Sequence, residues 1–157
     1  MNRVGIGIDV HRFVAGRKLV IGGVPIPHDQ GLEGHSDADV LAHSIADALL
    51  GAVALGDIGK FYPDTNVKFK NMDSMIILRD VAEKLQKLGA KIVNIDAAIV
   101  TQAPKLSPHI HKMQEVIGKN LGTAPSSVGI KATTSELMGF TGRKEGIVAI
   151  AIASVEM

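Results

Sequence analysis

Hydrophobic and polar positions alternate along the first residues of the chain. Aliphatic side chains fill the even positions: Val4, Ile6, Ile8 and Val10. The odd positions carry two glycines, a carboxylate and an imidazole: Gly5, Gly7, Asp9 and His11. Because alternate residues of a strand share a face, the pattern predicts a strand over residues 3–10. We expect its even face to point into the core and to leave Asp9 and His11 side by side on the other.

Periodicity and turn residues predict the remaining elements. Gly22 and Gly23 indicate a hairpin over residues 19–26. Ser36, three residues before Asp39, predicts the start of a helix in a capping-box-like arrangement. Apolar residues at helical spacing and turn signals then predict the other segments, which are helices over 40–52, 74–88 and 107–121, strands over 91–100, 127–134 and 147–157, and loops over 56–66 and 139–146.

This order of elements predicts an α/β fold, an α+β sandwich in which helices pack on one face of a mixed sheet. No repeat or linker interrupts the chain, so residues 1–157 are expected to form a single domain. The last strand is apolar at nearly every position, which predicts burial on both of its faces. In a chain of this size, packing between subunits could cover one of them.

Composition narrows the class of protein. The 157 residues are 46% hydrophobic and contain no Cys, so any metal must be held by His, Asp or Glu rather than by thiolates. The net charge of +1 gives no reason to expect a nucleic acid partner. No apolar run approaches the roughly 20 residues of a membrane span. We expect a cytoplasmic enzyme, although a plastid or organellar protein whose leader has been removed would look the same.

The strongest candidate chemistry is a metal site at the end of the first strand. Asp9 and His11 need a third ligand, and His43 is the leading candidate, because two His and one carboxylate with an open position suit catalytic zinc. Asp39 and Asp47 lie one helical turn to either side of His43 and could support it. The alternative is a solvated helix face, with Asp39 as a simple cap.

Further candidates lie at strand ends and in loops. His35 and Ser36 precede a helix N-terminus, which favours phosphate, although Ser36 could serve only as a cap. The TTSE segment at 133–136 could hold phosphate and a second hard cation, or could be only a turn. The loop at 56–66 could bind or gate a ligand, or be a tolerated surface loop. Together these features predict a metal-assisted enzyme acting on a phosphorylated small molecule, with the substrate left open.

Several segments resemble one known family. They are DVHRF at 9–13, IGG at 21–23, GHSDADVLAHSIADALLGAVALGDIGKFYPDT at 34–65, QAPKL at 102–106 and KATTSELMGFTGRKEGI at 131–147. In these segments the chain closely resembles the 2-C-methyl-D-erythritol 2,4-cyclodiphosphate synthases of the non-mevalonate (MEP) pathway of isoprenoid biosynthesis. The resemblance implies a lyase that cyclises 4-diphosphocytidyl-2-C-methyl-D-erythritol 2-phosphate and releases CMP. It also implies a homotrimer with active sites between neighbouring subunits.

The resemblance implies roles for individual residues. Asp9, His11 and His43 would bind zinc, and Glu136 would bind a second divalent ion, magnesium or manganese. His35 and Thr134 would act as catalytic residues at the phosphates. The substrate contacts implied by the resemblance are Asp9, His11, His35, Ser36, Asp57, Ile58, Gly59, Tyr62, Pro63, Asp64, Thr65, Asn66, Thr101, Gln102, Ala103, Pro104, Lys105, Leu106, Ser107, Thr133, Thr134, Ser135, Glu136, Phe140 and Arg143.

Within that set, Asp57 and the backbone of Ile58 and Gly59 would hold the erythritol hydroxyls. The segment 101–107, with Thr133, would form the cytidine diphosphate pocket. Phe140 and Arg143 would lie near the subunit junction, where family members can hold an isoprenoid diphosphate in a central cavity. The loop through Phe61 and Tyr62 would be a lid.

Three positions depart from the usual family pattern. Tyr62 stands where Phe is usual, Asn66 where Asp is usual, and Ser135 where Thr is often found. Asn66 puts in doubt a charged role for the end of the lid loop. Two other functions stay open: a zinc phosphohydrolase that uses water as the nucleophile, and a non-catalytic trimer that binds metal or isoprenoid diphosphate.

Overall fold

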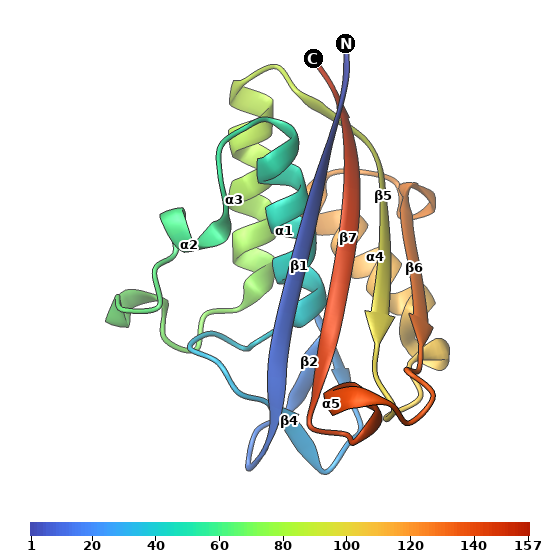
Figure 1. Ribbon diagram of the computed structural model, residues 1–157. Coiled ribbons are helices and arrows are strands. Elements are labelled where there is room, and N and C mark those ends of the chain that lie inside the picture. The colour runs from blue at the N-terminus through green and yellow to red at the C-terminus, as the bar shows by residue number, and fades with distance from the viewer.

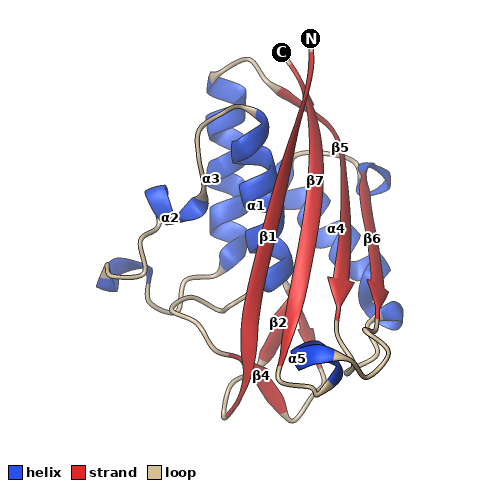
Figure 2. Ribbon diagram, in the orientation of Figure 1, coloured by secondary structure: helices blue, strands red, loops and turns tan.

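The chain folds as one sheet backed by helices, with a small hairpin beneath it (Figures 1 and 2). The computed structural model describes all residues from 1 to 157. The strands are β1 (Asn2–Ala15), β2 (Leu19–Ile21), β3 (Val24–Ile26), β4 (Gln30–Leu32), β5 (Lys91–Val100), β6 (Val128–Thr133) and β7 (Gly146–Glu156). The helices are α1 (Val40–Ala52), α2 (Ile58–Phe61), α3 (Ser74–Lys87), α4 (Ile110–Leu121) and α5 (Gly139–Gly142), with 3-10 turns at Val67–Phe69, Ser107–His109 and Pro125–Ser127.

The five-stranded sheet is mixed, as the sequence predicts. Its order is β4-β1-β7-β5-β6, and β2 pairs with β3 in a separate hairpin. Strand β7 runs antiparallel to both β1 and β5, whereas β5 and β6 are parallel. The long β1–β7 ladder brings the two termini together at one end of the sheet (Figure 1). This order leaves β1 and β6 on opposite sides of the central β7–β5 pair.

Helix α1 packs against β1 on the face that carries Gly5 and Gly7. A Cβ atom on Gly5 would lie 2.0 Å from the backbone oxygen of Ala48, and one on Gly7 would lie 2.0 Å from that of Ser44. Only glycine permits so close an approach between strand and helix. The prediction that the even face of β1 points into the core is therefore wrong, because the core face is the one with the glycines, Asp9 and His11.

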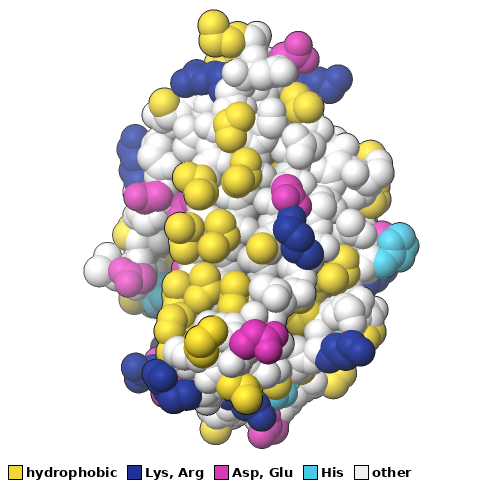
Figure 3. Space-filling model, turned by 45° about the vertical axis from the view of Figure 1, so that its right-hand side comes forward, with side chains coloured by type: hydrophobic (Ala, Val, Ile, Leu, Met, Phe, Trp, Pro, Cys, Tyr) yellow, Lys and Arg dark blue, Asp and Glu magenta, His cyan; other side chains and the backbone are white.

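On the opposite face of the sheet, the part formed by β1 and β7 is apolar and uncovered within one chain. Val4, Ile6, Ile8 and Val10 are between 51% and 67% exposed, and Ile152 of β7 is 47% exposed. Ile6 lies opposite Ile152 in the β1–β7 ladder, so the exposed residues of the two strands adjoin. Figure 3 shows hydrophobic side chains gathered in a column along this face. Within one chain, β7 is buried on one face only, so the predicted burial of its second face depends on packing between subunits and stays a prediction.

Helix α1 begins at Asp39, not at Ser36. The Asp39 side chain accepts hydrogen bonds from the backbone nitrogens of Ala42 at 3.0 Å, Gly22 at 2.8 Å and Gly23 at 2.7 Å. The carboxyl is fully buried, and this burial raises its pKa to about 6 despite the three hydrogen bonds. One side chain therefore caps the helix and also fixes the turn of the β2–β3 hairpin against it.

The other predicted elements fall close to their observed bounds. The helix predicted over 74–88 is α3, and Gly89 follows it with a φ of +73°. The strand over 91–100 is β5, and the predicted third helix is a 3-10 turn followed by α4. Strand β1 extends five residues beyond the predicted end at position 10. The predicted loops 56–66 and 139–146 each contain a short helix, α2 and α5. None of the helices combines the length and apolarity needed to cross a bilayer.

Candidate metal centre and active site

Three of the predicted ligands meet between β1 and α1. His11 Nε2 lies 2.9 Å from Asp9 Oδ2, and His43 Nδ1 lies 3.1 Å from the same oxygen. The two imidazole nitrogens are 3.4 Å apart. One atom from each residue lies within 4.8 Å of the others, so the group could hold a metal ion. Strand parity aligns Asp9 with His11, and the close approach of α1 at Gly7 brings His43 to them.

The electrostatics of this cluster favour positive charge. Burial acts to raise the pKa of Asp9, but the hydrogen bonds and charges of His11 and His43 outweigh it and hold the pKa well below its usual range. For His11, burial acts to lower the pKa, but hydrogen bonding and the charge of Asp9, helped by the Glu33 carbonyl, raise it overall. A site that stabilises an added proton in this way also suits a cation.

Hydrogen bonds around the cluster orient both imidazoles. His11 Nδ1 donates to the backbone oxygen of Glu33 at 2.6 Å, which leaves Nε2 facing Asp9. His43 Nε2 lies 2.9 Å from the hydroxyl of Ser74, which leaves Nδ1 facing Asp9. Two imidazole nitrogens and a carboxylate oxygen thus converge, and the other nitrogen of each ring has a hydrogen-bond partner, as is usual for metal-bound histidines. The residues present therefore fit a zinc ion.

The predicted support of His43 by Asp39 and Asp47 is wrong. Asp39 is committed to the backbone of the hairpin turn and of α1. Asp47 accepts a hydrogen bond from the Ile58 backbone nitrogen at 2.8 Å, and so fixes the start of α2. Burial, with the nearby charges of Asp57 and Asp9, raises the pKa of Asp47. Neither carboxylate hydrogen-bonds the His43 ring.

The cluster opens into a cavity of about 510 Å³. Its lining includes the predicted residues Asp9, His11, His35, Ser36, His43, Ile58, Gly59, Tyr62, Pro63, Asp64 and Thr65. His35 Nε2 bonds the backbone oxygen of Asn66 at 2.9 Å, so His35 and the end of the lid loop are in direct contact. The Asn66 side chain caps the following 3-10 turn by accepting a hydrogen bond from the Lys68 nitrogen at 3.0 Å.

Loop 56–66 is held by a hydrogen bond within the loop and by another to α3. Asp57 caps α2 by accepting a hydrogen bond from the Lys60 nitrogen at 3.1 Å, and it does not line the cavity. The hydroxyl of Tyr62 hydrogen-bonds Asp80 of α3. Because this loop carries residues of the cavity wall, the bonds from Tyr62 to Asp80 and from the Ile58 nitrogen to Asp47 hold that wall against α3 and α1.

A second, smaller cavity of about 260 Å³ lies at the ends of β5 and β6. Its lining includes the predicted residues Thr101, Gln102, Pro104, Lys105, Leu106, Ser107, Thr133 and Thr134. Ala103 is not part of the lining, but its carbonyl accepts a hydrogen bond from the Thr101 hydroxyl at 2.6 Å. The QAPKL and ATT segments, distant in sequence, are therefore neighbours, because β5 pairs with β6.

The remaining predicted residues follow β6. Glu136 is exposed and accepts a hydrogen bond from the Thr134 hydroxyl at 3.2 Å. Ser135 bonds the Thr141 hydroxyl at 2.6 Å and so steadies the turn. Phe140 lies beside Val10 and His11 in a shallow hollow, whereas Arg143 pairs with Glu145 at 2.8 Å. Within one chain, Glu136 does not belong to the cluster of Asp9, His11 and His43.

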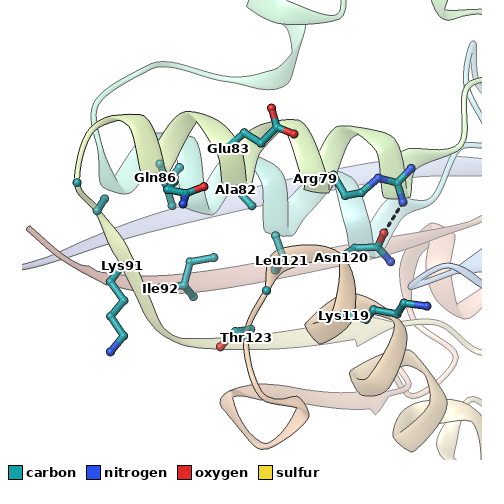
Figure 4. Close-up of a pocket in the computed structure, with 14 residues that line it drawn as sticks. Arg79, Ala82, Glu83, Gln86, Lys91, Ile92, Lys119, Asn120, Leu121 and Thr123 are labelled. Atoms are coloured by element: carbon teal, nitrogen blue, oxygen red, sulfur yellow. Dashed lines mark hydrogen bonds between the residues drawn. The ribbon is translucent and has the colours of Figure 1, made fainter.

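The two cavities lie on different strands of the sheet, the larger at β1 and the smaller at β5 and β6. A third hollow, of about 700 Å³, lies elsewhere, between α3, the C-terminal end of α4 and the start of β5 (Figure 4). Arg79 and Asn120 hydrogen-bond across its wall at 2.6 Å. None of the predicted site residues lines it, so this hollow is not part of the candidate site.

Sequence reasoning missed several residues of the site. Gly34, Phe69, Met72 and Ile77 also line the larger cavity. Ser74, which contacts His43, was identified only as the start of a helix. Ser74 is 31 residues from His43, and no spacing rule links them. Of these residues, only Gly34 lies in a segment that resembles the family, the one at 34–65.

Fold and site together define a single-domain α/β protein with a candidate His/Asp metal centre beside a cavity that loop 56–66 helps to line. Comparison with known protein families matches residues 2–156 to the YgbB family. The chain therefore belongs to the YgbB family.

Curated relatives agree over nearly the whole chain. The 2-C-methyl-D-erythritol 2,4-cyclodiphosphate synthase of Geobacter sulfurreducens is 56% identical over 154 residues, which cover 98% of each chain. The synthase of the same name from Syntrophobacter fumaroxidans is 55% identical over 150 residues, which cover 96% of this chain and 94% of that protein.

Solved structures show the same fold. The bifunctional IspDF of Campylobacter jejuni matches with a TM-score of 0.95 and 44% identity over 99% of this chain, which spans only 42% of that longer protein. IspF of Plasmodium falciparum, solved as a CDP complex, matches with a TM-score of 0.87 and 30% identity, covering 98% of this chain and 95% of that one.

Proposed function

We propose that this chain is a 2-C-methyl-D-erythritol 2,4-cyclodiphosphate synthase of isoprenoid precursor biosynthesis. Its substrate is 4-diphosphocytidyl-2-C-methyl-D-erythritol 2-phosphate. The 2-phosphate oxygen attacks the β-phosphorus, a new P–O–P bond closes the ring, and CMP leaves with the bridging oxygen. The observation that carries this proposal is the convergence of Asp9, His11 and His43 on one point of a cavity that His35 also lines.

The chain's own residues supply positioning and charge. The nucleophile is already an anion, so the reaction requires no general base, and the main barrier is the repulsion between two phosphates. His35 lies at the cavity wall, where its ring can donate to a phosphate oxygen. The backbone of Ile58 and Gly59, which line the cavity, would hold the erythritol hydroxyls. The resemblance adds Asp57, which caps α2 beside them and would have to turn towards the substrate. The lid loop excludes water, which would otherwise divert the reaction to hydrolysis.

Two cations complete the site. Asp9, His11 and His43 would hold zinc, and Glu136, beside Thr134, would hold magnesium or manganese with the diphosphate. When bound, these ions act as Lewis acids that neutralise developing charge on the phosphoryl oxygens. Thr134 would donate its hydroxyl to the same phosphates. In the lone chain this hydroxyl bonds Glu136, so the two residues already lie together.

We further propose that three chains assemble into a ring in which each active site combines two subunits. The apolar column of Val4, Ile6, Ile8 and Ile152 needs a partner, because contiguous exposed patches of this kind mark interfaces. The two cavities also lie on different strands, at β1 and at β5–β6. A neighbouring subunit can bring its β5–β6 cavity, with Thr101–Ser107 and Thr133 for cytidine diphosphate, against the metal centre. The CDP complex of the Plasmodium relative supports a nucleotide in such a pocket.

Phe140 and Arg143 would then lie near the junction of the subunits, where an isoprenoid diphosphate could be held. Phe140 adjoins the outer-face residue Val10, which supports this placement. The cytoplasmic location stays a prediction.

Phosphorus NMR of the purified protein with the cytidyl substrate, with and without magnesium, tests the reaction. We expect the two coupled signals of a cyclic diphosphate to appear together with CMP. CMP with an open-chain bisphosphate would instead indicate the zinc phosphohydrolase. Absence of turnover in a zinc-loaded trimer would favour a binding protein.

Subunit complementation tests the shared site. His43→Ala and Glu136→Ala trimers should each be inactive. In the proposed assembly, each site takes His43 from one subunit and Glu136 from its neighbour. After co-refolding at equal amounts, about a quarter of the sites should combine two intact halves, because each half is intact with a chance of about one in two. If the mixture stays inactive, the two residues act within one subunit and the shared site is wrong.

A further inference from the structure

The imidazole of His43 is held from both ends by different elements. Its Nδ1 faces Asp9 of β1 at 3.1 Å, and its Nε2 lies 2.9 Å from the hydroxyl of Ser74, the first residue of α3. His43 and Ser74 are both buried. A ring on α1 is therefore fixed between the strand that carries the other metal ligands and a third element that carries none.

The Ser74 hydroxyl is in turn held by Asp37. Asp37 Oδ1 lies 2.5 Å from Ser74 Oγ, and Asp37 Oδ2 accepts a hydrogen bond from the Ser74 backbone nitrogen at 3.0 Å. A carboxylate can only accept, so the single proton of the hydroxyl points to Asp37. Towards His43, Ser74 Oγ is then an acceptor, and the proton of the neutral imidazole must sit on Nε2. The lone pair of Nδ1 is left for the metal.

Ser74 does not serve as the cap of its own helix. The cap of α3 is Asp73, whose side chain accepts from the Met75 nitrogen at 2.8 Å. Ser36 Oγ also approaches His43 Nε2, but at 3.3 Å, and it accepts a hydrogen bond from the Ala38 nitrogen. The Asp37–Ser74 pair is thus the closer and better-anchored partner of the ring, and helix capping does not account for the hydroxyl.

We propose that Ser74 and Asp37 are positioning residues of the metal centre, which act on zinc through His43. They select the Nδ1 donor of His43, fix the rotation of its ring and lock the start of α3 onto the site. This inference rests on the proposed zinc centre and extends it to two residues that touch neither the metal nor the substrate. Partners of this type typically change metal affinity by about 10- to 100-fold.

Zinc affinity of the purified full-length protein, measured by competition with a chromophoric chelator, tests the proposal without an activity assay. Ser74→Ala should bind zinc about 10- to 100-fold more weakly than the wild type. Asp37→Asn should weaken binding in the same direction, and Ser74→Thr should restore most of it because it keeps the hydroxyl. Since Asp37 acts through Ser74, the double variant Asp37→Asn/Ser74→Ala should be no weaker than Ser74→Ala alone.

Ser44→Ala is the matched control. Ser44 is equally buried and follows His43 directly, but its hydroxyl bonds the Leu41 carbonyl at 2.9 Å and does not contact the imidazole. We expect wild-type zinc affinity in this variant. Cobalt substitution gives a second readout, since a reoriented His43 should shift the visible absorption of bound Co²⁺ in Ser74→Ala and not in Ser44→Ala.

The outcomes separate this proposal from the proposed function. If the wild type takes up no zinc, the metal centre itself is wrong, and the positioning role falls with it. If the wild type binds zinc and Ser74→Ala binds it equally well, with an unchanged cobalt spectrum, only the positioning role is wrong. An equal loss in Ser74→Ala and Ser44→Ala would also overturn it, because both would then act by loosening the fold.

Discussion

Substitution of Gly7 by Ala should damage the fold and the metal centre together. An added Cβ would lie 2.0 Å from the Ser44 carbonyl oxygen and 2.7 Å from the Ala48 nitrogen, and both atoms belong to the backbone of α1. Ordinary van der Waals contact begins at 3.4 Å, so the new methyl group is about 1.4 Å too close to the carbonyl. No side chain can rotate away to make room. The helix must therefore move off the strand.

The movement has two measurable costs. Overpacking of a core typically costs about 1–3 kcal/mol, and we expect the upper part of this range because the obstacle is helix backbone. His43, the residue before Ser44, would move away from Asp9, which now lies 3.1 Å from its Nδ1. A displacement of about 1 Å is enough to spoil metal geometry, so zinc affinity should fall by at least about tenfold.

Gly51→Ala is the control for this experiment. Gly51 lies on α1 beside the same strand, but an added Cβ would meet nothing closer than 3.8 Å. Alanine is the better helix former, so this variant should be unchanged or stabilised by up to about 1 kcal/mol. Denaturant unfolding at matched protein concentration and zinc competition are the two assays. An unaltered unfolding midpoint and zinc affinity in Gly7→Ala would refute the argument from close packing.

Four further predictions concern other residues. Tyr62→Phe removes the hydrogen bond to Asp80 and should lower the free energy of unfolding by about 1 kcal/mol. It should also raise the KM for the cytidyl substrate more than it lowers kcat, and an unchanged KM would show that this bond does not shape the cavity. Because the folded-state pKa of Asp39 is raised to about 6 from 3.8, its contribution to stability is fully present below about pH 4 and is lost as the pH rises through 6, by an amount on the order of 3 kcal/mol. The stability difference between wild type and Asp39→Asn, measured by chemical denaturation from pH 7 to pH 4, should therefore grow as the pH falls, and a constant difference would contradict the raised pKa. His43→Ala should lose zinc and most activity while the assembly survives, which metal analysis and sedimentation check; zinc retained by this variant would show that His43 is not a ligand. Glu136→Gln should keep zinc but respond less to magnesium, which a magnesium titration of activity checks.

Much of the fold was predictable because local patterns determine it. The amphipathic stripe of α3 and the Gly89 stop gave that helix nearly to the residue, and Gly122 ends α4 in the same left-handed conformation. The short helices α2 and α5 were missed because each has only four residues and lies in a segment rich in turn formers. Their formation depends on tertiary contacts, such as that from Asp47 to the Ile58 nitrogen.

The ligands of the candidate metal site were predictable, whereas the residues that hydrogen-bond those ligands were not. Strand parity aligned Asp9 with His11, and the position of His43 on a predicted helix, with a carboxylate one turn to either side, led to it as the third ligand. The partners of the ligands were assigned wrongly. Helical spacing pointed to Asp39 and Asp47, whereas the imidazole in fact bonds Ser74, which reaches it from another helix.

The sequence by itself determined the alternation of β1, the helical stripes and the identity of the residues that can bind a cation, because these depend on neighbours along the chain. Only the tertiary structure decided which face of β1 is buried. Hydrophobicity favours the row of Val4, Ile6 and Ile8, yet the helix packs on the glycines, because absence of a Cβ allows the backbones to approach. The aliphatic row is left outside, and the same close contact places His43 against Asp9. Such a choice depends on the fit between two surfaces, which no linear pattern contains.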